Sequence, residues 1–493
     1  MGRDNGMRER NPSIVIVGAG FAGLGMAIQL KRHGFHDFVV LEKSRALGGT
    51  WHDNTYPGCA CDVPSHMYSF SFELNPGWSR MFAPQPEIRA YLERTADKYD
   101  VRRHIRFGVA VEAMEYDEAA RRWNVTTADG AVLRPRAVVS AIGALHIPKY
   151  PDLPGIDKFQ GTAFHSAEWD HSHDLRGERV AVIGTGASAI QFVPRVAEKA
   201  ARLVVFQRTP PWIQPKPDFT IPAPVRALFK TVPGAARAFR YAIYWALEAR
   251  ALGFTVHPRL SGPQERLARR HLRRQIPDPE LRAKLTPDYT IGCKRVLLAN
   301  DYYPALMRPN VELETAGIAE VREHSIVTAD GREHEVDTII YGTGFKVTDA
   351  LAEQRVVGRG GLKIQEAWAN GIEAYRGTTI PGFPNFFFLL GPNTGLGHNS
   401  VVFMIEVQIQ HVLSCLRLLQ RLGADALEPR PGALRRYNDR MQRRLRRAVW
   451  SEGGCQSWYL DENGVNRTLW PGHTFEFWAQ TRRAKPEDYL IIR

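Results

Sequence analysis

Near the amino terminus, a short apolar run passes directly into a glycine-rich turn and then into a helix-like segment. The run SIVIV covers residues 13–17, and the turn is GAGFAG. In such a unit Gly18 allows the tight bend, Gly20 lets a pyrophosphate approach the backbone, and Gly23 lets the helix pack closely, while the free N–H groups of the helix start favour phosphate. A second run, FVVLE, ends in Glu42, whose carboxylate can accept both hydroxyls of an adenosine ribose. The spacing predicts a dinucleotide-binding fold.

The same pattern returns in the middle of the chain. RVAVIG runs into the turn GTGASA, which contributes Gly184, Gly186 and Ser188, and the next strand-like run ends at Arg208 and Thr209. A cation and a hydroxyl thus stand where the first unit has an acid, and they suit the 2′-phosphate of NADPH, which a carboxylate would repel. The alternative for Arg208 is an ordinary surface arginine after a strand. We predict FAD at the first unit and NADPH at the second.

The composition is that of an ordinary globular protein of roughly three domains. The chain has 493 residues, 44% hydrophobic and 24% charged, which excludes disordered, collagen-like and coiled-coil classes. Its five cysteines are an odd number without a Cys-x-x-Cys pair, which argues against a disulfide scaffold and for a reducing compartment. The start MGRDNGMRER lacks a signal-peptide core. We expect a cytoplasmic protein.

The net charge of +13 is concentrated in one region. Residues 221–290 hold 13 Lys+Arg against 5 Asp+Glu, and residues 435–447 are also rich in arginine. PQERLARRHLRRQI and RRYNDRMQRRLRRAV space apolar residues three and four apart, which predicts amphipathic helices. We expect solvated basic faces, with weak attachment to a membrane surface as the alternative. The run AFRYAIYWALEARALGFTV is interrupted by Arg240, Glu248 and Arg250, so we do not expect it to span a membrane.

A chain with two dinucleotide folds suits a disulfide reductase, a flavin monooxygenase or an oxidase. Disulfide reductases carry a redox cysteine directly after a Gly-Gly-Thr turn in this region, and here Trp51 follows that turn. Cys59 and Cys61 form a Cys-x-Cys pair, which fits that geometry poorly, and we interpret them as packing thiols. The reductase hypothesis is therefore disfavoured.

Two long segments match signatures of a known family. FQGTAFHSAEWD meets FxGxxxHxxxW followed by Pro or Asp, and the matched residues are Phe159, Gly161, His165, Trp169 and Asp170. GGTWHDNTYPGCACD meets GxWxxxxYPGxxxD, and the matched residues are Gly49, Trp51, Tyr56, Pro57, Gly58 and Asp62. On these motifs nearly the whole chain resembles the type I Baeyer–Villiger monooxygenases, the FAD- and NADPH-dependent class that inserts oxygen next to a ketone.

The resemblance implies roles for further residues. Asp62 falls on the family's active-site aspartate, and Arg295 falls on the arginine that faces the flavin, where a fixed cation stabilises the anionic flavin peroxide and then the adduct with the ketone. Other cofactor contacts implied by the resemblance are Gly49, Trp51, Tyr68, Val111, Lys294 and Trp458. His165 is expected to serve as a hinge between the cofactor domains rather than as a general base.

Two other functions are weighed beside ketone oxidation. A flavin N- or S-monooxygenase would share FxGxxxH and would take a thioether or amine in place of the ketone, with O2 as co-substrate. A nucleic-acid-binding module with a vestigial flavin fold would predict damaged glycine turns, and both turns are intact. We therefore expect no nucleic-acid partner and no metal site, and the sequence leaves the particular ketone and the oligomeric state open.

The expected fold class is α/β, with two Rossmann-like domains for FAD and NADP and a helical insertion in the NADP domain. The predicted FAD domain comprises residues 1–145 and, with the carboxyl-terminal region, residues 341–493. The predicted NADP domain comprises residues 155–214 and 291–340, with the helical insert at 215–290. Pro-rich stretches near residues 148–154 and 210–224 mark the joints.

Overall fold

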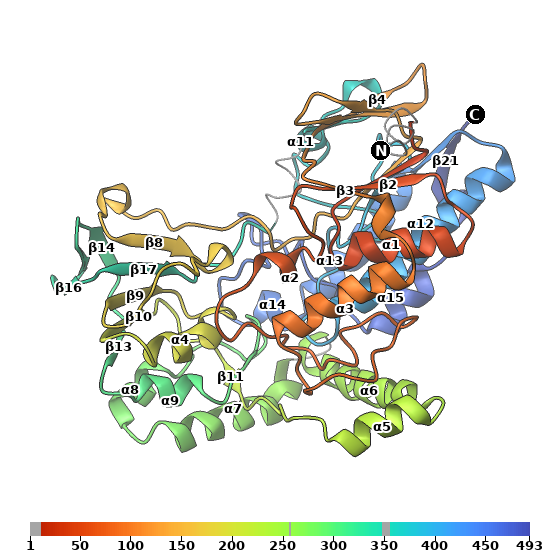
Figure 1. Ribbon diagram of the computed structural model, residues 1–493. Coiled ribbons are helices and arrows are strands. Elements are labelled where there is room, and N and C mark those ends of the chain that lie inside the picture. The colour runs from red at the N-terminus through yellow and green to blue at the C-terminus, as the bar shows by residue number, and fades with distance from the viewer. Residues whose placement is uncertain (1–10, 256–257, 348–354) are drawn as a thin grey trace, which may run out of the picture.

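Two five-stranded parallel sheets organise the molecule (Figure 1). The computed structural model describes residues 11–255, 258–347 and 355–493. The predicted α/β class with two dinucleotide-binding folds is confirmed. Residues 1–10, on which the expectation about a signal peptide rests, lie outside the described part.

The first sheet has the strand order β19-β7-β1-β2-β3, and all its neighbours run parallel. Its strands are β1 (Ile14–Val17), β2 (Phe38–Glu42), β3 (Ile105–Phe107), β7 (Ala137–Ser140) and β19 (Phe386–Phe388). Ile14 and Ile16 pack in the core cluster that includes α1 (Phe21–Arg32) and α12 (Val401–Leu422). Val15 and Val17 pack in the cluster on the other face. The sheet is therefore apolar on both sides, as parallel sheets are.

The second face of this sheet meets a smaller sheet of order β18-β4-β5-β6. Its strands are β4 (Val111–Asp117), β5 (Arg122–Thr127), β6 (Val132–Leu133) and β18 (Arg355–Val357). Trp123 of β5 is fully buried there and contacts Phe386 of β19.

The second parallel sheet has the order β13-β10-β9-β17-β8. Its strands are β8 (Thr162–His165), β9 (Arg179–Ile183), β10 (Arg202–Phe206), β13 (Val311–Glu314) and β17 (Thr338–Tyr341). Two helices, α4 (Ala189–Ala197) and α9 (Tyr302–Leu306), pack together beside it. An antiparallel sheet of β14 (Ile318–Val321), β15 (Ser325–Thr328) and β16 (Glu333–Glu335) lies at its edge (Figure 1).

Four helices follow one another between β11 (Ile213–Gln214) and β12 (Leu297–Leu298). They are α5 (Ala223–Thr231), α6 (Ala235–Thr255), α7 (Gly262–Gln275) and α8 (Pro279–Lys284), drawn in green along the lower edge of Figure 1. The helices predicted from the two arginine-rich segments are α7 and α13 (Pro431–Leu445). The division into domains stays a prediction.

The remaining elements complete the carboxyl-terminal half and the loops of the first unit. They are α2 (Thr50–Asp53), α3 (Gln85–Lys98), α11 (Ile364–Ala367), α14 (Val449–Glu452), α15 (Thr474–Thr481), β20 (Ala426–Pro429) and β21 (Tyr489–Ile492). Within the described residues, α12 is the one helix long and apolar enough to cross a membrane, and 67% of its most apolar stretch is buried inside the protein.

Candidate active site

The first glycine turn leaves open space at one position only. Gly18 has a φ of +102°, and a Cβ there would lie 2.7 Å from the carbonyl oxygen of Ala141. A Cβ at Gly23 would lie 1.8 Å from the carbonyl oxygen of Gly18, whereas at Gly20 the nearest atom would be 3.6 Å away. The protein itself therefore requires Gly18 and Gly23, and Gly20 faces the space that a pyrophosphate needs.

The start of α1 is prepared for an anion. Among the described residues no side chain caps this helix, and its first turn carries no acid. Its first N–H groups are therefore free to bind phosphate. At the end of β2, buried Glu42 accepts a hydrogen bond from the Ala19 N–H at 2.7 Å and another from the Ser44 N–H at 2.8 Å. These bonds fix the carboxylate, and each oxygen keeps a lone pair for a ribose hydroxyl. The residues present fit FAD.

The second turn repeats this geometry. Gly184 has a φ of +110°, and a Cβ there would lie 2.5 Å from the carbonyl oxygen of Gly342, whereas a Cβ at Gly186 would have 4.0 Å to its nearest atom. Ser188 occupies the N-cap position of α4, and within the described chain no side chain caps this helix. Ala189 stands where the first unit has its third glycine. This turn is also built for a pyrophosphate.

Two cations lie together beyond the end of β10. Arg208 is exposed and forms no ion pair with any residue that the structure describes. The pKa of Lys294 is lowered by burial and by the neighbouring Arg208 charge, with Asp288 opposing. Thr209 adjoins the turn, because its carbonyl oxygen accepts a bond from the Thr185 hydroxyl at 3.4 Å. Two like charges held close together favour an anion between them, so these residues fit the 2′-phosphate of NADPH.

Arg295 and Asp62 form the ion pair that the sequence predicted. The Arg295 Nε and Nη2 atoms lie 2.7 and 2.6 Å from the same Asp62 oxygen, Oδ2. The two side chains are 32% and 29% exposed, so the pair is not fully enclosed by the protein. Arg295 Nη1 also donates to the carbonyl oxygen of Leu396 at 3.4 Å. The Asp62 charge raises the pKa of Arg295, which therefore remains a permanent cation.

Apolar and aromatic groups surround this pair. Tyr68 accepts a hydrogen bond from the Trp51 indole at 3.1 Å, and burial raises the pKa of Tyr68. Tyr459 is buried close to Arg295 and Asp62, and burial raises its pKa to about 12. The pKa of the Cys61 thiol is likewise raised by burial, so this cysteine is a packing residue. Tyr459 has no signal in the sequence beyond its position after Trp458.

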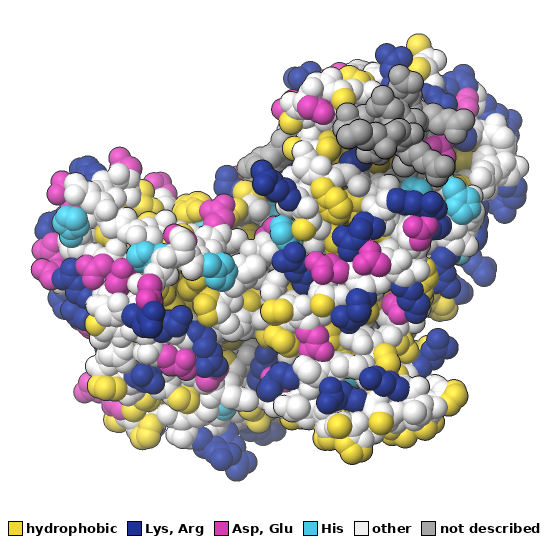
Figure 2. Space-filling model, in the orientation of Figure 1, with side chains coloured by type: hydrophobic (Ala, Val, Ile, Leu, Met, Phe, Trp, Pro, Cys, Tyr) yellow, Lys and Arg dark blue, Asp and Glu magenta, His cyan; other side chains and the backbone are white. Residues whose placement is uncertain are grey.

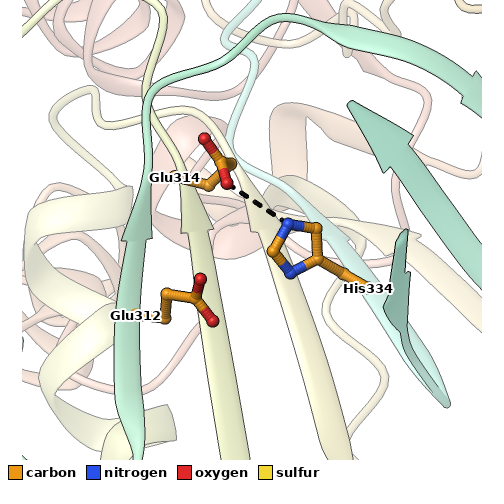
Figure 3. A group of neighbouring side chains, drawn as sticks. All are labelled: Glu312, Glu314 and His334. Atoms are coloured by element: carbon orange, nitrogen blue, oxygen red, sulfur yellow. Dashed lines mark hydrogen bonds and ion pairs between the residues drawn. The ribbon is translucent and has the colours of Figure 1, made fainter. Parts of the chain in front are cut away.

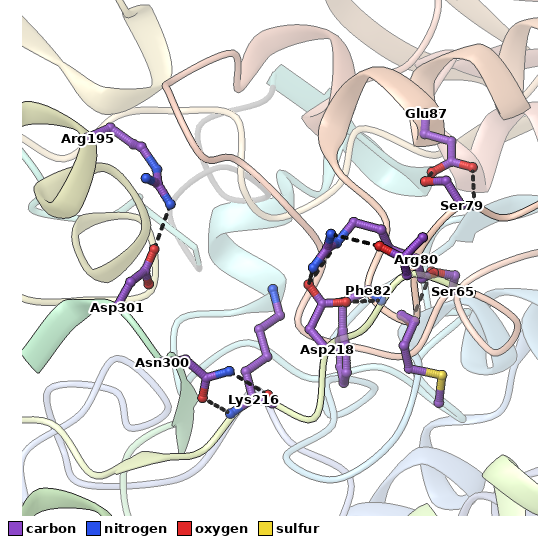
Figure 4. Close-up of polar contacts among 12 residues, drawn as sticks. Ser65, Ser79, Arg80, Phe82, Glu87, Arg195, Lys216, Asp218, Asn300 and Asp301 are labelled. Atoms are coloured by element: carbon purple, nitrogen blue, oxygen red, sulfur yellow. Dashed lines mark hydrogen bonds and ion pairs between the residues drawn. The ribbon is translucent and has the colours of Figure 1, made fainter. Parts of the chain in front are cut away.

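The loop that carries Asp62 is attached directly to the second dinucleotide unit. Tyr56 donates to the Gln191 side chain of α4 at 3.0 Å, and Gln191 also bonds the backbone of Ala60. Figure 4 shows Arg80 of the first unit and Asp218 of the second pointing toward one another, with Nη2 2.9 Å from Oδ2. These contacts place Asp62 against Arg295.

A buried carboxylate that the sequence did not single out as a site residue lies behind the loop that carries Leu396 and Asn399. Glu248 of α6 is 2% exposed and accepts from the Asn399 amide at 2.6 Å and from the Thr474 hydroxyl at 2.6 Å. His473 bonds its other oxygen at 3.1 Å, and His398 Nε2 lies 3.5 Å away. Burial alone would raise the pKa of Glu248, but these donors lower it to about 2. The carboxylate therefore fixes the loop that presents the Leu396 carbonyl to Arg295.

Among the described residues, no hydrogen bond or ion pair joins the FxGxxxHxxxW motif to Arg295. A Cβ at Gly161 would lie 2.3 Å from the carbonyl oxygen of Asp337. Phe159 packs against an apolar cluster on one face of the second parallel sheet. The Trp169 ring contacts Phe164 and Phe192. Asp170 accepts from the Ser172 N–H at 2.8 Å. These residues shape the second unit and its edge.

His165 is fully buried at the end of β8 beneath the two chain crossings between the units. Those crossings pair with each other, since the Lys149 N–H donates to Gly344 and the Lys346 N–H donates to Ile147. The His165 ring contacts Tyr150 and Phe345, one from each crossing. Burial lowers its pKa. The hinge role stays a prediction.

Three other residues predicted to contact a cofactor are Val111, Gly49 and Trp458. Val111 begins β4, two residues after Val109, whose N–H donates to the Glu42 carbonyl at 2.9 Å. Gly49, with a φ of +53°, lies against the phosphate turn, because a Cβ there would be 3.1 Å from Gly20 Cα. The Trp458 ring is exposed and contacts Tyr459, with 4.5 Å between ring centroids.

The expectation that the cysteines form no disulfide is wrong for one pair. Cys293 and Cys455 are bonded, although 162 residues separate them. The disulfide joins the segment of Lys294 and Arg295 to the segment of Trp458. Cys59 and Cys61 are free and buried, as the packing interpretation predicted.

One cluster in the described part has the composition of a metal site. The ligating atoms of Glu312, Glu314 and His334 lie within 4.8 Å of one another, and Figure 3 shows the His334 ring facing Glu314. Arg202 already pairs with Glu312 at 2.7 Å, and Arg332 pairs with Glu314 at 2.5 Å. The carboxylates are thus neutralised by guanidinium groups, and the cluster is an ion-pair network.

Known proteins share this architecture over its full length. A family model described as pyridine nucleotide-disulphide oxidoreductase matches residues 15–232. A Baeyer-Villiger monooxygenase of Streptomyces coelicolor is 51% identical over 481 residues, 97% of this chain and 92% of that protein. An oxidized steroid monooxygenase bound to NADP has a TM-score of 0.87 at 32% identity, covering 98% of this chain and 99% of the other. The OTEMO complex with FAD and NADP has a TM-score of 0.86 at 30% identity, covering 98% and 100%. The chain therefore belongs to the Baeyer–Villiger monooxygenase family.

Proposed function

We propose that this enzyme inserts one atom of O2 between the carbonyl carbon and a neighbouring carbon of a ketone. The products are an ester or lactone, NADP+ and water, from ketone, O2, NADPH and one proton. FAD bound at the first unit supplies the oxygen-activating chemistry once NADPH has reduced it. We further propose that the enzyme works in the cytoplasm, where NADPH is kept reduced.

The paired side chains of Arg295 and Asp62 carry this proposal. Asp62 takes up the Nε edge of the guanidinium, whereas Nη1 of Arg295 has, among the described residues, only a 3.4 Å bond to the Leu396 carbonyl. A fixed, permanently charged donor stabilises negative charge as it develops, first on the oxidant and then on the former carbonyl oxygen. Asp62 supplies the orientation and Arg295 supplies the charge.

The cations at the second unit select NADPH as the reductant. Arg208 and Lys294 would hold the 2′-phosphate of NADPH, and Gly186 leaves room for its pyrophosphate. Heteroatom oxidation remains the alternative activity, since a thioether needs no fixed cation for its attack. The family names of the relatives and the ion pair favour the ketone.

The test separates reduction from oxygen insertion. We expect Arg295→Ala to retain FAD and to be reduced by NADPH, but to make ester from a ketone panel about a hundred to a thousand times more slowly, the usual cost of a removed oxyanion donor. Asp62→Ala should show a smaller loss, because Arg295 keeps its charge and loses only its orientation. Rapid-mixing absorbance measures reduction, and mass spectrometry measures ester.

Two further measurements make this test decisive. Arg295→Lys keeps the charge without the two-point contact to Asp62, and should recover part of the ester activity. A thioether oxidised equally well by wild type and Arg295→Ala would show that only ketone oxidation needs the cation. Ester formed by Arg295→Ala at nearly the wild-type rate would refute the assignment.

A further inference from the structure

The helix α6 buries two charged side chains, Arg240 and Glu248, and exposes apolar ones. Arg240 is 6% exposed and donates to the carbonyl oxygens of His66 and Ser69 at 2.6 and 3.0 Å. Glu248 is 2% exposed and bonded to the loop behind the active site. The sequence showed this helix only as interrupted by charged residues, and in the fold two of them, Arg240 and Glu248, form their bonds inside the protein.

From Tyr241 to Leu252 the exposed side of α6 is apolar. Tyr241, Trp245 and Leu252 are 57%, 58% and 45% exposed. The other exposed residues between Tyr241 and Leu252 are alanines at 242, 246 and 249. A helix that faces water normally presents polar residues there. Solvent alone does not account for this face.

Neighbouring elements extend the stripe. Leu228 and Val232 are exposed on and just after α5, which packs against α6, and the Phe475 ring contacts Trp245 with 6.0 Å between centroids. We call these residues the α5–α6 apolar face: Leu228, Val232, Tyr241, Trp245, Leu252 and Phe475. Figure 2 shows hydrophobic side chains gathered at this lower edge of the molecule, over α5 and α6. Contiguous exposed patches of this kind mark interaction sites.

Along α5 and α6 the exposed charge has one sign. Between residues 219 and 264 the sequence holds a single acid, Glu248, and it is buried. Lys230 and Arg237 are exposed on α5 and α6, and within the described chain neither forms an ion pair. An apolar helix face with a basic rim is the pattern that rests on anionic lipid.

We propose that the α5–α6 apolar face docks on the surface of an anionic lipid membrane, with α6 lying in the plane of the interface. Trp245 and Tyr241 have rings with an apolar body and a polar tip, which suits the headgroup level. A second copy of the chain fits less well, because a two-fold contact through this face would bring Lys230 and Arg237 of both copies into one interface, and α5 and α6 expose no acid to pair them. The inference is independent of the reaction that the enzyme catalyses.

The test is co-sedimentation of the holoenzyme with vesicles of phosphatidylcholine, with and without about 30% phosphatidylglycerol. We expect the wild type to pellet with the anionic vesicles and less with the neutral ones. Tyr241→Ser combined with Trp245→Ser should weaken binding at least about tenfold, since two aromatic side chains no longer leave water. Lys230→Glu combined with Arg237→Glu should abolish the preference for anionic lipid, and added salt should weaken it.

Matched controls place the effect on this face. Met307→Ser removes an apolar side chain that is 44% exposed elsewhere on the protein, and this variant should bind like wild type. Arg273→Glu combined with Arg274→Glu removes exposed charge from α7 and should have the smaller effect. All these variants should oxidise NADPH normally in solution, which also shows that they fold.

Three results would overturn the proposal. Wild type that stays in the supernatant with anionic vesicles excludes lipid as the occupant. If the α7 variant and the α5–α6 variants lost vesicle binding equally, the binding would come from the general positive charge of the protein surface and not from this face. Absence of vesicle binding together with a dimer in sedimentation velocity, dissolved by Tyr241→Ser with Trp245→Ser, would identify a second copy of the chain as the partner.

Discussion

The two dinucleotide units share a backbone and differ in the charge at one strand end. Both turns place a glycine with positive φ against a carbonyl oxygen and leave the next glycine open. Beyond this turn, β2 ends in Glu42, whereas Arg208 follows β10. The shared backbone serves the pyrophosphate, and the strand-end side chain selects the nucleotide.

The units also differ in how firmly that side chain is held. Glu42 is buried and held by two backbone N–H groups, whereas Arg208 is exposed and unpaired among the described residues. A fixed acceptor suits a resident cofactor, because no ordering is needed on binding. An exposed cation that no described residue pairs with suits a cofactor that enters and leaves at every turnover.

The largest expected effect comes from filling the open glycines. A Cβ at Gly20 or Gly186 meets no protein atom within about 3.5 Å, so Gly20→Val and Gly186→Val should fold. Gly20→Val should purify without FAD, and Gly186→Val should keep FAD but fail to be reduced by NADPH. Absorbance spectra and anaerobic reduction measure both.

Gly23→Val is the matched control for this comparison. Its Cβ would meet the Gly18 carbonyl oxygen at 1.8 Å, so this variant should lose stability as well as FAD. If Gly20→Val retained bound FAD, the pyrophosphate would not lie against the first turn, and the likeness of the two units would fail.

The second effect tests the charge difference. Arg208→Ala should lower kcat/KM for NADPH about ten- to a hundredfold and leave that for NADH unchanged, because a charge-assisted bond to the 2′-phosphate is lost. Steady-state kinetics with both nucleotides measures it. Arg202→Ala is the matched control. Arg202 lies at the start of β10 and pairs with Glu312, so its removal should leave the preference for NADPH over NADH intact. An unchanged preference in Arg208→Ala would contradict the 2′-phosphate assignment.

The third effect concerns Glu248, which ties the helices of the second unit to the loop near Arg295. Glu248→Gln should lower the free energy of unfolding by about 3 kcal/mol at neutral pH, because hydrogen bonds to a buried charge are weakened. The folded-state pKa of Glu248 is lowered to about 2, so its contribution is full above the ordinary glutamate pKa and fades as the pH falls toward 2.

Urea unfolding across this acid range measures the difference. The gap between wild type and Glu248→Gln should narrow as the pH decreases. Glu265→Gln, on the surface of α7, provides the matched control and should change little. A gap that is independent of pH would show that Glu248 is not charged in the fold.

The smallest effect is a shift in a pH profile. Burial and Arg208 lower the pKa of Lys294, so this lysine should lose its proton below the ordinary lysine range. Affinity for NADPH should then fall as the pH rises through that pKa. Lys294→Arg remains charged and should keep its KM for NADPH flat over the same range. Identical alkaline limbs in the two enzymes would exclude Lys294 from the phosphate site.

Local patterns predicted the two dinucleotide units well. Strand, turn and helix are neighbours in sequence, so β1, α1, β2 and their counterparts β9, α4, β10 follow from periodicity and glycine spacing. The Arg295–Asp62 pair came from the family resemblance, because 233 residues separate the two side chains. Spacing alone could not have joined them.

The orientation of α6 and the pairing of Cys293 with Cys455 could not be predicted in this way. A charged side chain in a sequence does not show which group it will contact, so the sequence assigned no partners to the arginines of α6. Arg240 finds backbone carbonyls of the loop at 66–69 only in the folded chain. The same applies to Glu248, whose donors come from two other segments.

The sequence by itself determined the two nucleotide folds, the acid at the strand end of the first and the cation at the strand end of the second, and the family. These depend on residues close together along the chain, where backbone geometry is set by local steric limits. The tertiary structure decided which charges meet and which faces remain open. Burial makes a charge depend on distant donors, so the ion pair at the active site, the buried carboxylate behind it and the outward apolar stripe of α6 exist only once the two units and their helices have packed together.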